Sequence, residues 1–287
     1  MLFRRTGETI GGPETLLHGV AKYIDREAFK LTVVDFAPSA DFRSRFLQDI
    51  AGYGVETASI PAKGKFDFRS VKFLADLLEQ RRIDVLHTHD HRSNFVGFWA
   101  TRRRPTPIMV TSHQPLRRYW WLRHIEILDD HLIRRFDRIL PVAQAVADEI
   151  LAKRPDLSAR TITVLNGVDL DLFKVNGRAR GDIRAELGIP DKVFLCVTLG
   201  RIMEDKGLTY LIDAQRQLAH AGMEVYQLLV GNGPLMEMLQ RRVRQLGLEH
   251  RIRFTGHRRD IPDLLHACDL LVVSSLSEGL SVAIIEG

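Results

Sequence analysis

The chain has 287 residues, a length that suggests two domains of ordinary size. Hydrophobic residues make up 45% of it and charged residues 27%, so we expect a packed soluble protein, and no apolar stretch is long enough to span a bilayer. The formal net charge of +5 is compatible with phosphate-bearing substrates, anionic lipid or nucleic acid, and it decides among none of them.

The chain begins with MLFRRTGETIGG, which has basic residues but no apolar core after them. No signal peptide is predicted from this pattern, so we expect a cytoplasmic protein or one that contacts the inner membrane face peripherally. The apolar residues of the next segment, 13–25, recur at helical spacing and predict an amphipathic helix.

Short apolar runs then alternate with helical patterns, and they are apolar throughout rather than at every second residue, which is typical of strands buried on both faces. The predicted strands cover residues 30–36, 83–89, 107–113, 137–143, 161–166, 192–200, 224–231, 251–256 and 269–275. Alternation of strands and helices predicts doubly wound parallel sheets.

A polar stretch over residues 174–192 interrupts this alternation and indicates the entry to a second α/β domain. We therefore expect one Rossmann-like domain over residues 1–172 and another over residues 173–287, facing each other across a cleft. The second contains a predicted helix over 207–222. Cys196 and Cys268 lie in or beside apolar runs and are expected to be small core residues, not a disulfide.

Two cations follow the strand predicted over 192–200. Arg201 and Lys206 stand in GRIMEDKG, just before a helix that begins near Gly207. Free N–H groups at a helix start, with a guanidinium and an ammonium, would suit a pyrophosphate, although two solvated surface cations explain the spacing equally well. One unit later, Gly231 and Gly233 would allow a ligand to approach the backbone, but a plain strand-to-helix turn is the commoner cause.

Two carboxylates, Glu278 and Glu286, stand eight residues apart in SSLSEGLSVAIIEG. Ser281 is placed to cap a short helix, which would put Glu278 at the cleft edge and Glu286 on the helix behind it. A carboxylate can accept two hydroxyls of a sugar or a ribose, and the plain alternatives are a loop carboxylate and a solvated helix residue.

GRIMEDKG followed by SEGLSVAIIEG resembles the retaining group 1 family of nucleotide-sugar glycosyltransferases, which have the GT-B fold. The resemblance extends over nearly the whole chain, through GGPETLLHGVA, DVLHTHDHRSN, VTSHQ, DRILPVAQAVADEI, TVLNGVDLDLF and FTGHRRDIPDLLHACDLLVVSS. Gln144 departs from it, since the family often has serine there. The family continues past Glu286 and normally has a longer strand before its glycine loop. The resemblance therefore implies a second domain truncated at its C-terminus, and it raises the same question for the N-terminus.

The resemblance also implies roles for matching residues. Arg201 and Lys206 would hold the donor diphosphate, Glu286 the nucleotide ribose, and Glu278 the donor sugar. The remaining implied residues are Gly11 and Gly12 in a loop near the phosphate, Gly231 in the donor site, His113 beside the donor sugar, and Asn166, Gly167 and Asp169 in a structural element at the domain junction. Similar enzymes need no metal or other cofactor and transfer sugar with retention to a glycan or lipid-linked glycan. The leaving phosphate is thought to take the acceptor proton, with cations stabilising it.

Three further segments carry polar side chains that are weaker candidates. HTHDH holds His87, His89, Asp90 and His91, the right types for a metal, but His87 and His89 would point to one face and Asp90 to the other. The DLD of residues 169–171 fits a turn better than a metal motif. PLRRYWWLRH mixes Arg117, Arg118 and Arg123 with Tyr119, Trp120 and Trp121, which suits a membrane interface or a lipid-linked acceptor as well as a solvated helix.

Alternatives to the transferase stay open. A nucleotide-sugar 2-epimerase shares the fold, although the GRIMEDKG loop together with the two glutamates favours the transferase. An incomplete copy would be non-catalytic and would bind a nucleotide weakly or not at all. A nucleic-acid binder rests on charge alone and ranks last, so no nucleic-acid partner is expected.

Overall fold

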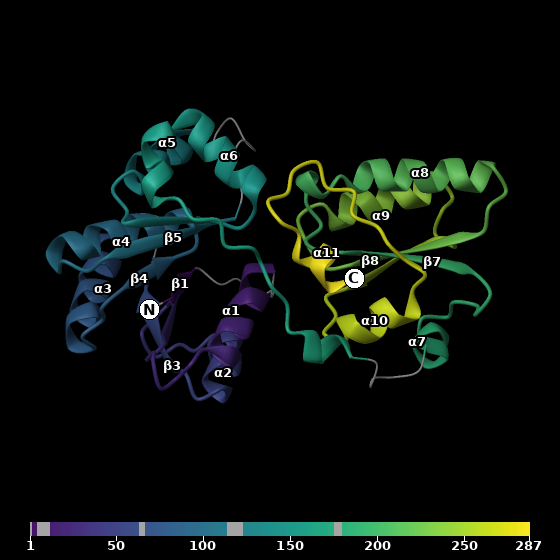
Figure 1. The fold of residues 1–287 in the computed structure, drawn as a ribbon. Helices are drawn as coiled ribbons and strands as arrows, with labels where there is room; N and C mark the ends of the chain where they lie inside the picture. The colour runs from purple at the N-terminus through teal and green to yellow at the C-terminus, as the bar shows by residue number, and fades with distance from the viewer. Residues whose placement is uncertain (1, 5–11, 63–66, 114–122, 175–179) are drawn as a thin grey trace. The chain divides into compact units, whose positions relative to one another are not determined.

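The structure, a computed structural model, describes residues 2–4, 12–62, 67–113, 123–174 and 180–287. The chain divides into two compact units, Met1–Asn166 and Gly167–Gly287, and each has its own sheet (Figure 1). The boundary expected from the sequence lies slightly later, after residue 172.

In the part of the chain that the structure describes, the first unit has a sheet of six parallel strands. Their order across the sheet is β3 (Glu56–Pro61), β2 (Thr32–Ala37), β1 (Leu2–Arg4), β4 (Leu86–Thr88), β5 (Ile108–Ser112) and β6 (Arg138–Pro141). This is the strand order of a Rossmann fold, and the direction of winding reverses between β1 and β4. The predicted doubly wound sheet is confirmed here.

Helices cover both faces of this first sheet. They are α1 (Gly12–Tyr23), α2 (Arg45–Gly52), α3 (Phe68–Gln80), α4 (His91–Arg103), α5 (Arg123–Ile133) and α6 (Gln144–Lys153). Val33 of β2 packs in a cluster with α1 and α2, whereas its neighbour Val34 packs in a second cluster with α3 and α4. Successive side chains of a strand point to opposite faces, so β2 is buried on both sides, as its continuous apolar run predicted.

The sequence prediction missed two strands of this unit and added one. β1 has only three residues, and β3 mixes polar and apolar residues, so neither formed a long apolar run. Residues 161–166 were predicted as a strand but make only a single bridge, from Thr161 to Ile139 of β6. Ile162, Val164 and Leu165 are exposed there, so their apolar composition does not reflect burial in the sheet.

Within residues 180–287, the second unit has a sheet of four parallel strands. Their order is β10 (Leu270–Leu271), β7 (Phe194–Leu199), β8 (Val225–Val230) and β9 (Ile252–Gly256). The chain therefore winds outward from β7 through β8 and β9, and then crosses to the other side of β7 to form β10. The direction of winding reverses between β7 and β10.

Helices also cover both faces of the second sheet. They are α8 (Leu208–His220) and α9 (Met236–Gln245) on one face, α7 (Arg180–Glu186) and α10 (Ile261–Ala267) on the other, and α11 (Val282–Glu286), which follows β10 (Figure 1). The helix predicted over 207–222 is confirmed as α8. Cys196 is buried and Cys268 is partly buried, both are free, and burial raises the pKa of the Cys196 thiol to about 11. They are core residues, as predicted.

A fully buried arginine connects α7 to the sheet of the second unit. The guanidinium of Arg184 donates to the carbonyl oxygens of residues 190, 191, 193 and 267 at 2.9–3.1 Å and to the Asp269 carboxylate at 2.8 Å. Asp269 also accepts from the backbone N–H of Leu195, at 2.8 Å, and from Arg180, at 2.7 Å. Burial alone would raise the pKa of Asp269, but these hydrogen bonds and charges outweigh it and hold the pKa below its usual value.

Replacing Arg184 with methionine should destabilise the protein by about 3 kcal/mol, because four backbone carbonyls and the Asp269 carboxylate lose a fully buried donor, and one hydrogen bond to a charged group contributes about 1.5–3 kcal/mol. The free energy of unfolding in urea measures the change. Arg244→Met serves as the control, since Arg244 is an exposed arginine of α9, and its effect should stay below about 0.5 kcal/mol. Equal losses from the two substitutions would contradict the structural role of Arg184.

Candidate functional site

The loops after β7 and β10 meet at the carboxyl edge of the second sheet. The two strands are parallel neighbours, and the winding reverses between them. In open parallel sheets, ligands bind outside the carboxyl ends of the strands at such a reversal, because the loops diverge there and leave an opening. Lys206 follows β7 and Glu278 follows β10, so the fold brings together two predicted residues that are 72 positions apart.

Lys206 and Glu278 form an ion pair at this edge. The Nζ atom of Lys206 contacts Oε1 of Glu278, and the two side chains are only 19% and 21% exposed. The hydroxyl of Ser275 donates to the same oxygen at 2.7 Å. The site therefore presents a cation and a carboxylate side by side, and a hydroxyl holds the carboxylate in place.

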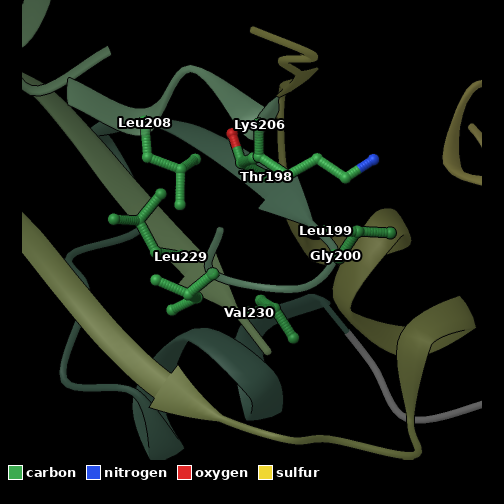
Figure 2. A pocket seen from close by; sticks show the side chains of 8 residues that line it. Thr198, Leu199, Gly200, Lys206, Leu208, Leu229 and Val230 are labelled. Carbon is green, nitrogen blue, oxygen red and sulfur yellow. The ribbon is translucent and has the colours of Figure 1, made fainter. Parts of the chain in front are cut away.

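A small pocket opens beside Lys206 (Figure 2). Its lining residues come from β7, β8 and the segment after β7: Thr198, Leu199, Gly200, Ile202, Lys206, Leu208, Leu229 and Val230. Figure 2 shows the Lys206 side chain extending away from Leu208 and Leu229, toward the side on which Leu199 lies.

Arg201 is exposed, directly after the end of β7 and Gly200. Within the described residues its guanidinium makes no side-chain hydrogen bond or ion pair. An arginine without internal partners can donate to a ligand without first giving up another contact. Arg201 and Lys206 thus both follow the carboxyl end of β7. Arg201 is exposed, and Lys206 is paired with Glu278.

Gly231 and Gly233 are explained by close packing between two loops. A Cβ at Gly231 would lie 2.0 Å from the carbonyl oxygen of Gly200, and one at Gly233 would lie 2.2 Å from that of Ile202. Gly231 also has a φ of +134°. The main chains of the loops after β7 and β8 are therefore in direct contact. This packing is sufficient to explain why residues 231 and 233 are glycines.

Glu286 is the last residue of α11. Burial raises the pKa of its carboxyl group, and its side chain has no hydrogen-bond partner within the described residues. Ser281 occupies the N-cap position of α11 as expected, but its side chain makes no capping hydrogen bond. A partly buried carboxylate in this state gains most from a ligand that can donate hydroxyl groups to it.

Three histidine rings lie together at the carboxyl edge of the first sheet. The rings of His87 and His89 have centroids 4.3 Å apart, and Nδ1 of His89 lies 3.4 Å from Nε2 of His113. Nε2 of His87 is hydrogen-bonded to the Thr111 hydroxyl at 2.6 Å. Burial lowers the pKa of His87 to about 4, so this ring is neutral at pH 7.

The other polar residues of HTHDH fix the start of α4. Asp90 is the N-cap and accepts from the Ser93 N–H at 2.7 Å. Nδ1 of His91 lies 2.7 Å from the buried carboxylate of Asp129, which also accepts from Asn94 at 2.8 Å. Among the residues that the structure describes, no group of three or more His, Cys, Asp or Glu could hold a metal ion.

Some predicted residues cannot be placed. Gly11 and residues 117–121 of the aromatic and basic segment lie outside the described residues, whereas Gly12 is the first residue of α1. The boundary between the two units falls between Asn166 and Gly167. Asp169 caps a short 3-10 helix, Leu170–Phe173, by accepting from the Asp171 N–H at 3.1 Å, so the DLD segment forms a turn of helix.

Sequence reasoning missed two residues that shape these sites. Ser275 stands three positions before Glu278, a spacing at which a hydroxyl can reach a carboxylate, so a local signal existed. Asp129 is 38 positions from His91 and had no local signal. In the described part of the chain, no helix is both long enough and apolar enough to pass through a bilayer.

Comparison with known families covers both units. The profile of Glycosyltransferase Family 4 matches residues 10–172, and the profile of Glycosyl transferases group 1 matches residues 179–287. The chain is a group 1 glycosyltransferase. Its two Rossmann-like units are those of the GT-B fold. The predicted family and fold are therefore confirmed.

Individual relatives agree with this assignment. This glycosyltransferase is 25% identical to EpsF of Bacillus subtilis (strain 168), over 98% of this chain and 74% of that protein. It is 29% identical to the UDP-Gal:alpha-D-GlcNAc-diphosphoundecaprenol alpha-1,3-galactosyltransferase of Escherichia coli, over 77% of this chain and 59% of that protein. The chain is also similar to the crystal structure of Anabaena Alr3699/HepE in complex with UDP-glucose, with a TM-score of 0.79 and 23% identity. The match covers 96% of this chain and 73% of that one. The chain thus spans about three fifths to three quarters of the length of these proteins.

Proposed function

We propose that this glycosyltransferase moves a sugar from a nucleotide-diphosphate sugar to a hydroxyl of a glycan or lipid-linked glycan, with retention of configuration. The observation that carries the proposal is the meeting of Lys206 and Glu278 at the winding reversal of the second sheet. Support also comes from Anabaena HepE, which was crystallised with UDP and with UDP-glucose, and from the diphosphoundecaprenol-linked substrate in the name of the Escherichia coli relative.

Arg201 and Lys206 are the proposed diphosphate ligands. Both follow the end of β7, and charge-assisted hydrogen bonds to phosphate oxygens are stronger than neutral ones. When the bond between sugar and diphosphate breaks, negative charge builds up on the leaving oxygen, and fixed cations stabilise it. On this proposal the two side chains carry out the task that a metal ion performs elsewhere, so no cofactor is invoked.

Glu278 and Glu286 are the proposed acceptors of hydroxyl groups. Glu278 lies beside the lysine that would hold the phosphate, which suits the sugar attached to that phosphate. Glu286 is partly buried and its side chain has no partner in the described residues, which suits a ribose diol. His113 of the first unit is proposed to contact the donor sugar, and Gly12 and Gly231 are proposed to serve the phosphate side. A cytoplasmic location with peripheral contact at the inner membrane face fits a lipid-linked acceptor.

The phosphate assignment predicts that Arg201→Ala and Lys206→Ala each weaken UDP binding by about 1.5–3 kcal/mol, the scale of a hydrogen bond to a charged group. Isothermal titration calorimetry measures the affinity. Lys192→Ala is the matched control, because Lys192 is exposed just before the opposite, amino end of β7 and should leave affinity unchanged. Wild-type affinity in both site variants would remove Arg201 and Lys206 from the phosphate site.

Transfer itself is tested by incubating the protein with UDP-, GDP- and ADP-sugars and a set of glycan and lipid-linked acceptors. We expect a product whose new linkage has the same anomeric configuration as the donor, as read by proton NMR, and no loss of rate with a chelator. An inverted product would refute retention, and a strict metal requirement would refute the role given to the cations.

The partly buried carboxyl of Glu286 predicts a pH dependence of nucleotide binding. Its pKa is raised, and ribose hydroxyls favour its charged form, so affinity should fall as the pH drops through that raised pKa. The loss should begin at a higher pH than an ordinary glutamate would give. Glu286→Gln should bind the nucleotide more weakly than wild type at pH 7, and its affinity should lack the part of the pH dependence that comes from Glu286. The titration of the nucleotide phosphate affects the affinity of both proteins equally. Identical pH profiles for the two proteins would show that Glu286 does not bind the ribose.

A further inference from the structure

Two consecutive serines contact the two partners of the Lys206–Glu278 ion pair. The hydroxyl of Ser274 donates to the backbone carbonyl of Lys206 at 2.8 Å. The hydroxyl of Ser275 donates to Oε1 of Glu278 at 2.7 Å. One serine therefore holds the main chain of the lysine, and the next holds the side chain of the glutamate.

The main chains on either side of these contacts are also in direct contact. A Cβ at Gly207 would lie 2.1 Å from the carbonyl oxygen of Ser274, and Gly207 has a φ of +60°, which favours glycine. The backbone N–H of Leu276 donates to the carbonyl of Asp205 at 2.7 Å. The segment 205–207 is thus closely packed on the segment 274–276, with no space for a side chain between Gly207 and Ser274.

This packing leaves the ammonium of Lys206 as the adjustable part. A lysine side chain is long and flexible, so fixing its main chain does not fix its charged end. The charged end contacts Oε1 of Glu278, the same atom that accepts from Ser275. Because the ammonium is flexible, it can turn toward a phosphate oxygen while the Ser275 hydroxyl keeps its hydrogen bond to the Glu278 carboxylate.

We propose that Ser275 is a positioning residue for sugar transfer, acting through Glu278, and that Ser274 is a positioning residue for nucleotide binding, acting through the main chain of Lys206. The inference rests on the proposed function, since it assigns these serines to the same donor site. The two roles differ in one measurable respect. Loss of the Ser275 hydroxyl affects the donor sugar and the chemical step, whereas loss of the Ser274 hydroxyl affects every ligand that carries the diphosphate.

The test compares Ser274→Ala, Ser275→Ala and Ser275→Thr with wild type, using UDP, the matching UDP-sugar, and steady-state transfer. Ser275→Ala should keep UDP affinity within about twofold of wild type but lower kcat by about tenfold or more, on the scale of one hydrogen bond to a charged group. Ser275→Thr retains a hydroxyl and should restore most of kcat. Ser274→Ala should weaken UDP and the UDP-sugar by the same factor. Ser158→Ala, an exposed serine in the first unit, is the control and should match wild type.

Two further measurements keep the test decisive. If Ser275→Ala does not fold, Ser275→Cys replaces it, because a thiol is a weak donor of similar shape. A double-mutant cycle of Ser275→Ala and Glu278→Ala, read by urea unfolding without ligand, should give non-additive losses if the two side chains are coupled. Additive losses would overturn the contact on which the inference depends.

The outcomes separate the inference from the proposed function. If wild type binds none of UDP, GDP and ADP, the proposed function is overturned, and the cycle alone reports on the serine–glutamate contact. If wild type binds and transfers while Ser275→Ala keeps wild-type kcat, the positioning role is overturned and the function stands. If Ser275→Ala instead weakens UDP and UDP-sugar equally, as expected for Ser274→Ala, the serine only stabilises the loop and the inference is wrong.

Discussion

In the second unit the chain must place β10 beside β7 after it has already built β8 and β9 on the other side of β7. Parallel strands can be joined only through connections that cross one face of the sheet, and crossings of this kind have one hand. The connections through α8 and α9 therefore cover one face, while α10 covers the opposite one. The loops after β7 and β10 therefore leave neighbouring strands at this winding reversal, where open parallel sheets leave an opening for ligands. Every feature of the candidate donor site depends on this opening.

The charges at the opening are balanced before any ligand arrives. The attraction between a partly buried ammonium and a partly buried carboxylate offsets part of the cost of removing both groups from water. On the proposed function, an incoming diphosphate adds negative charge next to Glu278, so Lys206 would be shared between two anions. A neighbouring hydroxyl that holds the carboxylate, and an exposed Arg201 that adds a second positive charge, both reduce the repulsion that such sharing creates.

The sequence predicted the parts of this architecture that depend on local patterns. Continuous apolar runs located β2, β5, β7 and β8, because a strand buried on both faces has few polar positions. The same rule failed for β3, whose pattern is mixed, and for residues 161–166, whose apolar side chains are exposed. The resemblance located Lys206 and Glu278, but nothing local indicated their ion pair. Arg184 stands in the polar stretch 174–192 and had no local signal, since its partner Asp269 is 85 positions away.

The ion pair of the buried Arg184 with Asp269 also acts at the far end of the strands. The Asp269 carboxylate, just before β10, accepts a hydrogen bond from the backbone N–H of Leu195 near the start of β7. This contact fixes which residue of β10 stands opposite which residue of β7. A slip of one residue between parallel strands moves one strand by about 3.3 Å along the other and turns its side chains to the opposite face. Glu278 would then miss Lys206 altogether. The alignment of the candidate donor site thus depends on residues at the amino ends of the strands, and on the proposed function a change at Arg184 or Asp269 would alter sugar transfer without changing any residue of that site.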